Sequence, residues 1–397
     1  MKVLLSLITL LALFFTLNAQ NVTYIDITQA KYEEINAEKI FENIRVVPLE
    51  THEDGLLTKS ASYYLTEKHV IGMNFLEGAY LFDKNTGHFI REISSHGQGP
   101  DQYIGPLSNR YGIDEKNSIL FANSAGPSGK SWKCINIGTN KVESTIKKPL
   151  PENINDFHNP QVPWFIKDNV YISFCNNRTG KNKTRLVVYD IEGNIIKRYL
   201  NHFEYDTKGM TSFPSYPGIF YYYNNQTYFK EWNYNDTIFC VDEKGMSPHI
   251  VFELGDKQPS YYHQGDTNHS KGKYLINFAH ESDAFVLFNF SCYKGIIEIF
   301  GSKYSDRGAT YTGYYDKKSK QTYISAPADL KKTGYVISGI PIGFCPVSIN
   351  MNNEMVAYID PEILMEHKDK IGPEYKKIFQ NIQEDDNPIV IIAKLRD

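Results

Sequence analysis

The sequence predicts an all-β protein in which about six similar sheets form one closed ring. Three observations support this fold class: a composition that favours strands, a strand–turn–strand unit that recurs, and apolar strands near both ends of the domain. The 397 residues include 29 Tyr and 23 Phe, which pack well on the half-buried surface of a sheet. The 27 Gly and 18 Pro are spread through the chain and supply turns between short strands.

The recurring unit is an apolar strand that ends in Asp or a similar residue, followed by a turn and a second strand. Its clearest copy runs from Leu81 to Ile93, and we align Asp83 of that copy with positions 137, 190, 242 and 316. The intervals are 54, 53 and 52 residues, and then a longer one of 74 that predicts an insertion or an irregular unit. A period near 50 residues with four strands per unit is typical of a propeller blade.

These intervals predict a six-bladed β-propeller, a single domain that spans residues 44–397 after a lead-in over 20–43. A ring of blades buries both faces of each sheet and leaves only short edges. A pair of β-sandwiches, the alternative fold, predicts no constant interval. Because a ring must join its ends, we expect the apolar strand 44–49 to complete a blade with the apolar strand 388–395.

Helical periodicity is scarce and is clearest over residues 361–383. Pro361 suits the first position of a helix, and Gly372-Pro373 divides the segment into two helices. We therefore expect a short helical insertion near the C-terminal end of the sequence.

Residues 1–19 predict a secretory signal peptide. A basic residue precedes an apolar core from Val3 to Phe15, and Ala19 suits cleavage. The alternative, an N-terminal membrane anchor, needs a longer apolar stretch, and no Cys closely follows the apolar core to accept a lipid. We therefore expect an exported protein, periplasmic or extracellular, that is soluble after signal cleavage and has no membrane span.

Charge and composition exclude several classes of protein. Lys+Arg 42 against Asp+Glu 46 gives a net charge of −4, which provides no bulk attraction to nucleic-acid phosphates. Hydrophobic residues make up 41% of the chain and aromatic residues 14%, which is too apolar for a disordered protein. We expect no nucleic-acid partner, and the oligomeric state stays open.

The cysteines predict neither a zinc site nor a redox centre, because they lie far apart and form no C-x-x-C motif. Each has apolar or aromatic neighbours, so we expect buried strand residues. One disulfide is an alternative in an exported protein, with no pairing favoured among Cys134, Cys175, Cys240, Cys292 and Cys345.

The segment 96–110 is the most distinctive stretch for a ligand site, with glycines, prolines and several polar groups. We predict that it presents ligand-binding candidates at the mouth of the ring: His96, Gln98, Tyr103 and Arg110. The alternative is a rigid connection in which Tyr103 packs between blades. The segment is not a phosphate loop, because it lacks G-K-[ST] and a following helix.

Other clusters point less clearly to chemistry. His263, His269 and His280 have spacings that match no standard metal site, so we expect neither a metal nor a cofactor. The aromatic run from Tyr221 to Trp232 suits either stacking on a sugar or peptide, or the alternating faces of a blade. No G-x-S-x-G motif occurs.

Three segments resemble one known family. The residues VPLET at 47–51, the hairpin FDKNTGHFIREI at 82–93 and the stretch HGQGPDQY at 96–103 resemble motifs of six-bladed β-propeller proteins abundant in Bacteroidetes. The ending DDNP at 385–388 is also similar. This chain has Gln102 where that family usually has Glu before Tyr. The resemblance implies a six-bladed ring similar in fold to NHL-repeat propellers, export, and a largely uncharacterised role.

The sequence favours a non-enzymatic binding or scaffold protein at the cell envelope, with a glycan, peptide or protein ligand. The alternative is a metal-dependent, lactonase-like hydrolase or a lyase that uses the channel of the propeller, with Asp114 and Asp283 as conceivable contributors. A structural protein, which assembles as an oligomer, is a third hypothesis. A channel lined by aromatic and neutral polar groups would favour binding, whereas several carboxylate, Asn or His groups meeting on the axis would favour an enzyme.

Overall fold

The structure, a computed structural model, describes most of the chain from residue 22 onwards. The described residues are 22–74, 78–95, 97, 99–103, 112–124, 129–151, 153, 160–177, 179–205, 218–232, 234–263, 267–292, 295–299, 302–306, 310–325 and 334–397. Within these ranges, no helix is long and apolar enough to cross a membrane.

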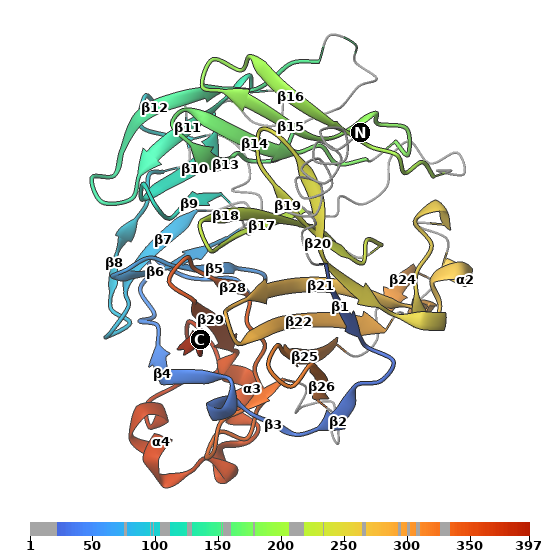
Figure 1. Cartoon of the computed structure of the whole chain (residues 1–397). Coiled ribbons are helices and arrows are strands. Elements are labelled where there is room, and N and C mark those ends of the chain that lie inside the picture. The colour runs from blue at the N-terminus through green and yellow to red at the C-terminus, as the bar shows by residue number, and fades with distance from the viewer. Residues whose placement is uncertain are drawn as a thin grey trace, which may run out of the picture.

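Six antiparallel sheets follow one another around a ring, which confirms the predicted six-bladed propeller (Figure 1). The chain builds each blade from the axis outwards. Blade 1 consists of β5 (Ser62–Leu65), β6 (His69–Met73), β7 (Ala79–Asp83) and β8 (Phe89–Glu92). Blade 2 consists of β9 (Ile113–Asp114), β10 (Ile119–Asn123), β11 (Ser131–Asn136) and β12 (Lys141–Lys147). Blade 3 consists of β13 (Trp164–Lys167), β14 (Val170–Phe174), β15 (Thr184–Asp190) and β16 (Ile195–Leu200).

The second half of the ring follows the same plan. Blade 4 consists of β17 (Gly218–Tyr223), β18 (Gln226–Glu231), β19 (Thr237–Val241) and β20 (Met246–Glu253). Blade 5 consists of β21 (Tyr274–Glu281), β22 (Phe285–Cys292), β25 (Thr310–Asp316) and β26 (Gln321–Ser325). Blade 6 consists of β28 (Ser348–Ile349), β29 (Glu354–Ile359), β30 (Ile389–Leu395) and β4 (Phe41–Pro48).

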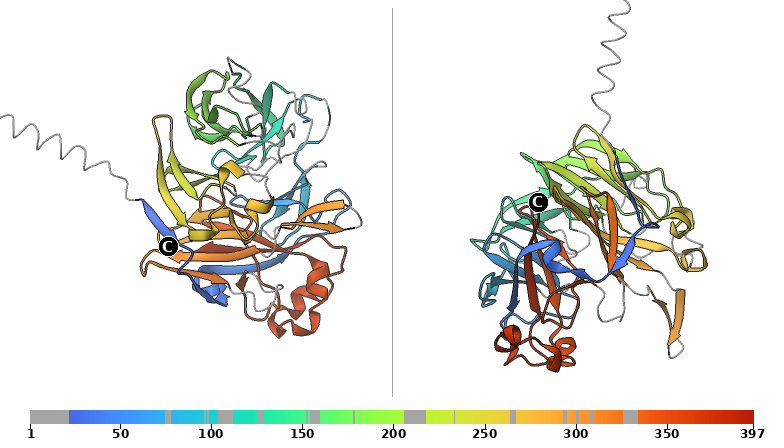
Figure 2. Two further views of the ribbon diagram at one scale, coloured as in Figure 1. Left: turned by 90° about the vertical axis from the view of Figure 1, so that its right-hand side faces the viewer. Right: turned by 60° about the horizontal axis from the view of Figure 1, so that its bottom comes forward.

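Blade 6 closes the ring with strands from both ends of the domain. β30 pairs antiparallel with β4, and Ile391 lies opposite Val46. In Figure 2 the blue strand β4 accordingly lies beside the red strands of the same blade. This pairing confirms the closure expected from the two apolar strands.

The lead-in binds to the outside of the ring before it enters blade 6. Its strands β1 (Thr23–Asp26) and β2 (Lys31–Glu33) pair in parallel with the outermost strands of blades 4 and 5. β3 (Ile35–Asn36) pairs with β27 (Tyr335–Val336). Since an uncovered strand edge can pair with another chain, the lead-in protects two of these edges.

The recurring turn of the sequence is the connection between the third and fourth strands of a blade, which we call the outer turn. Asp83 Oδ1 accepts hydrogen bonds from the backbone N–H of Asn85 and Thr86. Asp190, Asp242 and Asp316 accept equivalent bonds in blades 3, 4 and 5. In blade 2 the equivalent residue is Asn136, which accepts from Thr139 N. The alignment to position 137 was therefore wrong by one residue.

Two insertions account for the irregular spacing and the helices. The hairpin β23 (Gly295–Ile299) and β24 (Ser302–Asp306) lies between the second and third strands of blade 5, within the interval of 74 residues. Helices α3 (Pro361–Met365) and α4 (Pro373–Phe379) lie between β29 and β30 and project from the ring (Figure 2). This confirms the predicted helical insertion.

Apolar side chains from adjacent blades pack together to form the core. One cluster joins blade 1 to blade 2, another joins blade 3 to blade 4, and the largest surrounds blade 6 and the helices. None of the five cysteines, all of which are described, forms a disulfide; Cys134 and Cys175 are buried as expected, and the other three are partly buried.

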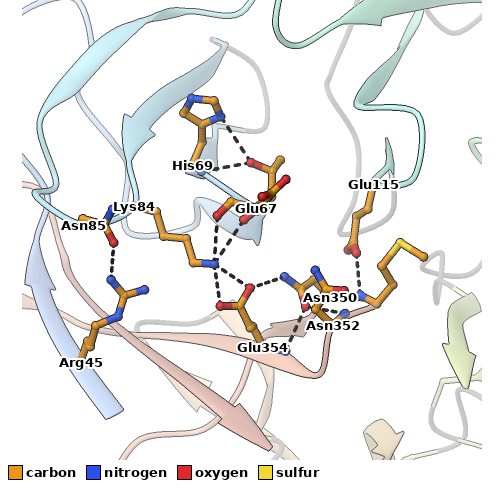
Figure 3. A network of polar contacts seen from close by, with 11 residues as sticks. Arg45, Glu67, His69, Lys84, Asn85, Glu115, Asn350, Asn352 and Glu354 are labelled. Atoms are coloured by element: carbon orange, nitrogen blue, oxygen red, sulfur yellow. Dashed lines mark hydrogen bonds and ion pairs between the residues drawn. The ribbon is translucent and has the colours of Figure 1, made fainter. Parts of the chain in front are cut away.

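A buried ion pair joins the blade that closes the ring to blade 1. In an antiparallel four-stranded blade, the turn between the first two strands, which we call the inner turn, lies at the same end as the outer turn. Lys84 in the outer turn of blade 1 is 5% exposed, and its Nζ lies 2.6 Å from both carboxylate oxygens of Glu354. The ammonium group also donates to the backbone carbonyls of Thr66 and Glu67 in its own inner turn. Figure 3 shows these contacts.

We expect Lys84→Met to lower the free energy of unfolding by about 3 kcal/mol, because it leaves a largely buried carboxylate without its partner. The matched control is Lys59→Met, which breaks the exposed pair with Glu362 and should cause little change. Urea unfolding of both variants measures the difference. Equal effects would contradict a special role for the buried pair.

Candidate functional site

The end of the ring that carries the inner and outer turns has an open pocket at its centre, which we call the mouth pocket. Its volume is about 500 Å³. Five of the six blades contribute to its walls, and blade 1 does not. The lining residues are Lys116, Phe165, Ile166, Tyr222, Tyr223, Asn224, Asn225, Asp283, Met351, Asn353 and Asp397.

A tight hairpin places the two tyrosines of the mouth pocket. Asn224 and Asn225 form the inner turn of blade 4 with φ of 47° and 58°, the left-handed values that a two-residue type I′ turn requires. Successive side chains of a strand point in opposite directions. Accordingly, the Tyr222 hydroxyl donates to the backbone carbonyl of Phe165 in blade 3, and the Tyr223 hydroxyl donates to Asp283 Oδ1 in blade 5 at 2.9 Å.

A buried network of charged residues, centred on Glu281, contacts Tyr223 through Lys317. Glu281 is 1% exposed, and its carboxylate accepts hydrogen bonds from Lys317 at 2.8 Å and from Tyr221 at 3.1 Å. It also lies 2.7 Å from His249 Nε2. Burial acts to raise the pKa of Glu281, but His249 and Lys317 outweigh it and hold this pKa below its usual value.

Lys317 connects this network to the wall of the mouth pocket. Its Nζ lies 4.4 Å from the centre of the Tyr223 ring and also donates to the backbone carbonyl of Ser282. The cation–π contact and the hydrogen bond from Tyr223 to Asp283 hold the ring from two sides. Tyr223 is therefore fixed in place before any ligand arrives.

Glu115 spans the mouth between two blades that are not neighbours. It lies in the inner turn of blade 2, and its Oε2 accepts a 2.7 Å hydrogen bond from the backbone N–H of Met351 in blade 6 (Figure 3). Burial raises the pKa of Glu115 to about 8, and the nearby charges of Asp114 and Glu354 act in the same direction, against the hydrogen bond from Met351. The Glu115 side chain is therefore mostly protonated at neutral pH.

The described residues of the segment predicted to bind a ligand, 97 and 99–103, follow β8 of blade 1, which ends on the side of the ring opposite the inner and outer turns. His96, Gln98 and Arg110 lie outside the described residues. Tyr103 is 1% exposed and packs in the core between the two blades, where burial raises the pKa of its hydroxyl. The ligand-binding role of these four residues stays a prediction.

The described part of this segment is tightly bonded to itself and to blade 2. The Gln102 side chain accepts a 2.9 Å hydrogen bond from Gly99 N and donates to Ser95 Oγ. Lys133 on β11 donates to the backbone carbonyls of Gly99 and Pro100. A neutral Gln at position 102 can donate and accept in these contacts, whereas a carboxylate there could only accept.

The residues considered for an enzyme are dispersed. Asp114 is 6% exposed and accepts hydrogen bonds from the backbone and side-chain nitrogens of Asn117, so it closes the inner turn of blade 2. Asp283 lines the mouth pocket. His263 and His269 stack on each other with ring centroids 3.8 Å apart. Among the residues described, no three of His, Cys, Asp and Glu form a group that could hold a metal.

Sequence reasoning missed most of the mouth pocket, although two signals were present. Asn224-Asn225 between aromatic runs is a hairpin-turn signal that places Tyr222 and Tyr223 at one end of the ring. Asp-Lys occurs at the start of the outer turn in blades 1 and 5, at 83–84 and 316–317, and both lysines bind a carboxylate at 2.8 Å or less. Tyr221, by contrast, packs in the core with Tyr228, as the alternating faces of a blade predict.

The fold and this pocket define a six-bladed propeller with a polar, aromatic-lined hollow on its axis. Residues 22–394 match a family described as a domain of unknown function, DUF4934, and the chain belongs to that family. No curated protein matches the chain.

Two solved structures share the fold. One is a Bacteroides fragilis protein described as a presumed exported protein, with a TM-score of 0.66 at 16% identity over 95% of this chain and 100% of that one. The other is a DUF4221 family member from Bacteroides vulgatus, with a TM-score of 0.52 at 10% identity over 89% of this chain and 99% of that one. These similarities agree with the six-bladed ring and with the resemblance noted in the sequence.

We expect Glu115→Gln to change how stability depends on pH. The folded-state pKa of about 8 lies above the ordinary 4.5, so the stability that the protonated Glu115 contributes is lost as pH rises through that interval. The loss is at most about 1.4 kcal/mol per pH unit. Urea unfolding between pH 5 and pH 8 should show the wild type losing stability relative to the variant. A constant difference between the two proteins across this range would contradict the shift.

Proposed function

We propose that this protein is an exported, non-enzymatic binding protein of the cell envelope and that the mouth pocket is its ligand site. The observation that carries the proposal is the lining of the pocket, which combines the rings of Phe165, Tyr222 and Tyr223 with the amides of three asparagines. Ligand sites pair an apolar or aromatic surface with a few placed polar groups, and their volumes run from roughly 300 to 1,000 Å³.

The chemistry of the pocket favours a carbohydrate among the ligand classes that the sequence left open. Asn224, Asn225 and Asn353 offer both donors and acceptors, and Asp283 offers acceptors, which suits a ring of hydroxyl groups. A flat aromatic side chain such as Tyr223 can pack against the C–H face of a sugar. An extended peptide usually binds along a sheet edge or groove, whereas this pocket is a compact hollow on the axis.

The fixed position of Tyr223 supports a binding role further. Lys317 and Asp283 hold the ring and its hydroxyl in the free protein, so little conformational entropy is lost when a ligand packs against it. The ion pair of Glu281 with Lys317 holds Lys317 in place and so supports the same preorganised wall.

Export rests on two supports. Residues 1–19 have the pattern of a signal peptide, and the similar Bacteroides fragilis protein is described as presumed exported. Fractionation of cells that produce the full-length chain tests this part of the proposal. Recovery of the mature protein outside the cytoplasm would support it, and retention of the unprocessed chain in the cytoplasm would contradict it.

We expect at least one member of a panel of mono- and disaccharides to raise the thermal unfolding temperature of the wild-type protein, since a ligand at 100 times its dissociation constant adds about 2.7 kcal/mol of stability. Tyr223→Ala should abolish this shift, because it removes the aromatic wall of the pocket. Tyr24→Ala, which removes a 58% exposed ring on β1, is the matched control and should retain it.

The same assay separates the competing functions. Ca²⁺, Zn²⁺ and short peptides are measured beside the saccharides. A shift with a metal ion alone would favour the metal-dependent alternative, and a shift with peptides alone would replace the carbohydrate. Retention of the saccharide response in Tyr223→Ala would place the site elsewhere on the molecule.

A further inference from the structure

A second, narrow cavity lies on the axis of the ring, directly beneath the mouth pocket. Its volume is about 30 Å³, and the innermost strands of all six blades or the residues beside them line it. Glu115, Tyr221 and Ile349 line this cavity, whereas Lys116, Tyr222 and Met351 line the mouth pocket. The two spaces therefore follow one another along the same strands and turns.

Two polar atoms of the cavity wall lack a partner. Trp164 is 9% exposed and His280 is 3% exposed, and both side chains line the cavity. Neither Trp164 Nε1 nor His280 Nε2 has a hydrogen-bond partner among the described residues. A buried polar group without a partner is costly, so these two atoms indicate that the cavity is made to hold a hydrogen-bonding group.

The size of the cavity restricts that group. A water molecule needs roughly 10–15 Å³ of this kind of volume, so about 30 Å³ accommodates two water-sized groups, or one –CH₂OH group. A whole sugar ring, or an amino-acid side chain longer than that of serine, must stay in the mouth pocket above.

The charge of the wall favours a neutral group. Burial lowers the pKa of His280 to about 4 and raises the pKa of Glu115 to about 8, so neither side chain is mostly charged at neutral pH. The indole N–H of Trp164 can only donate a hydrogen bond. The nitrogen Nε2 of the neutral His280 ring donates or accepts according to its tautomer. A hydroxyl group, which both donates and accepts, has the chemistry that both atoms require.

We propose that the axial cavity is the inner subsite of the mouth pocket and takes one hydroxyl group of the ligand, with water in its place when no ligand is bound. This inference rests on the proposed carbohydrate-binding function. A hydroxymethyl group reaches furthest from a pyranose ring, and it would enter beside the hydrogen bond between Glu115 and Met351. Trp164 and His280 would then be the residues that recognise it.

Paired sugars test the subsite by calorimetry. The pairs are D-glucose with 6-deoxy-D-glucose, D-galactose with D-fucose, and D-mannose with D-rhamnose, in which the second sugar lacks only the 6-hydroxyl. We expect the wild-type protein to bind at least one hexose about ten-fold more tightly than its 6-deoxy partner, the worth of one well-placed hydrogen bond. Trp164→Phe, which removes the N–H and keeps an aromatic ring, should abolish that preference.

Trp132→Phe is the matched control, because Trp132 is buried between blades 2 and 3 and does not line the cavity. It should keep the preference. If sugars bind but the wild type shows no preference, or if Trp164→Phe retains it, the subsite is wrong and the proposed function stands. If no sugar binds at all, the proposed function and the inference fail together.

A crystal structure of the wild-type protein without ligand provides a test that does not depend on the sugar. We expect an ordered water within about 3 Å of both Trp164 Nε1 and His280 Nε2. An empty cavity, or a metal or halide ion identified by its anomalous signal, would overturn the inference.

Discussion

The pairing of β4 with β30 is the constraint on which the rest of the structure depends. A propeller blade cannot bury its own faces, so each blade is stable only between two neighbours. Pairing the first strand of the ring with the last, with Ile391 opposite Val46, gives blade 6 its outer strand. It also fixes the relative positions of the two ends of the ring. In the closed ring each of the six blades packs between two neighbours, whereas an open stack would leave its two end blades with one neighbour each.

Closure also determines how the polar end of the ring is held together. Lys84 and Lys317 occupy the same position of the outer turn, one residue after the turn Asp, in blades 1 and 5. Each reaches the inner turn of its own blade and a group on the preceding blade, Glu354 in one case and Tyr223 in the other. The ammonium group thereby joins neighbouring blades at this end of the ring.

The sequence contained enough information for the ring but not for the pocket, and the reason is physical. Blade spacing follows from local signals, because Asp83 and its equivalents stabilise their turns through bonds within four residues. The closing strands are apolar runs that any sheet would bury. The mouth pocket instead collects groups of one to four residues from five blades, about one blade apart in sequence, and no single local pattern marks the whole set.

The ligand-binding role of the segment 96–110 stays a prediction, and turn chemistry offers a second explanation for its local pattern. Its glycines and prolines are conspicuous in sequence, and the described part uses them for a tight connection in which Lys133 and Gln102 bond the backbone. A segment rich in glycine and proline therefore indicates tight turns of the backbone, and does not by itself indicate that a ligand binds. Asp283, which carried no spacing signal at all, lines the pocket.

Three consecutive tyrosines at the end of β17 show why this protein is rich in tyrosine. Tyr221, Tyr222 and Tyr223 are consecutive, yet Tyr221 bonds the buried Glu281, Tyr222 bonds blade 3 and Tyr223 bonds blade 5. A phenol ring can do all three because its body is apolar and its hydroxyl reaches a polar partner. Phe at these positions would fill the same space but remove one hydrogen-bond donor from each of Glu281, Asp283 and the Phe165 carbonyl. The same residue type thus packs the blades, joins them and forms the wall of the mouth pocket, which is why composition alone could indicate the sheet but not the site.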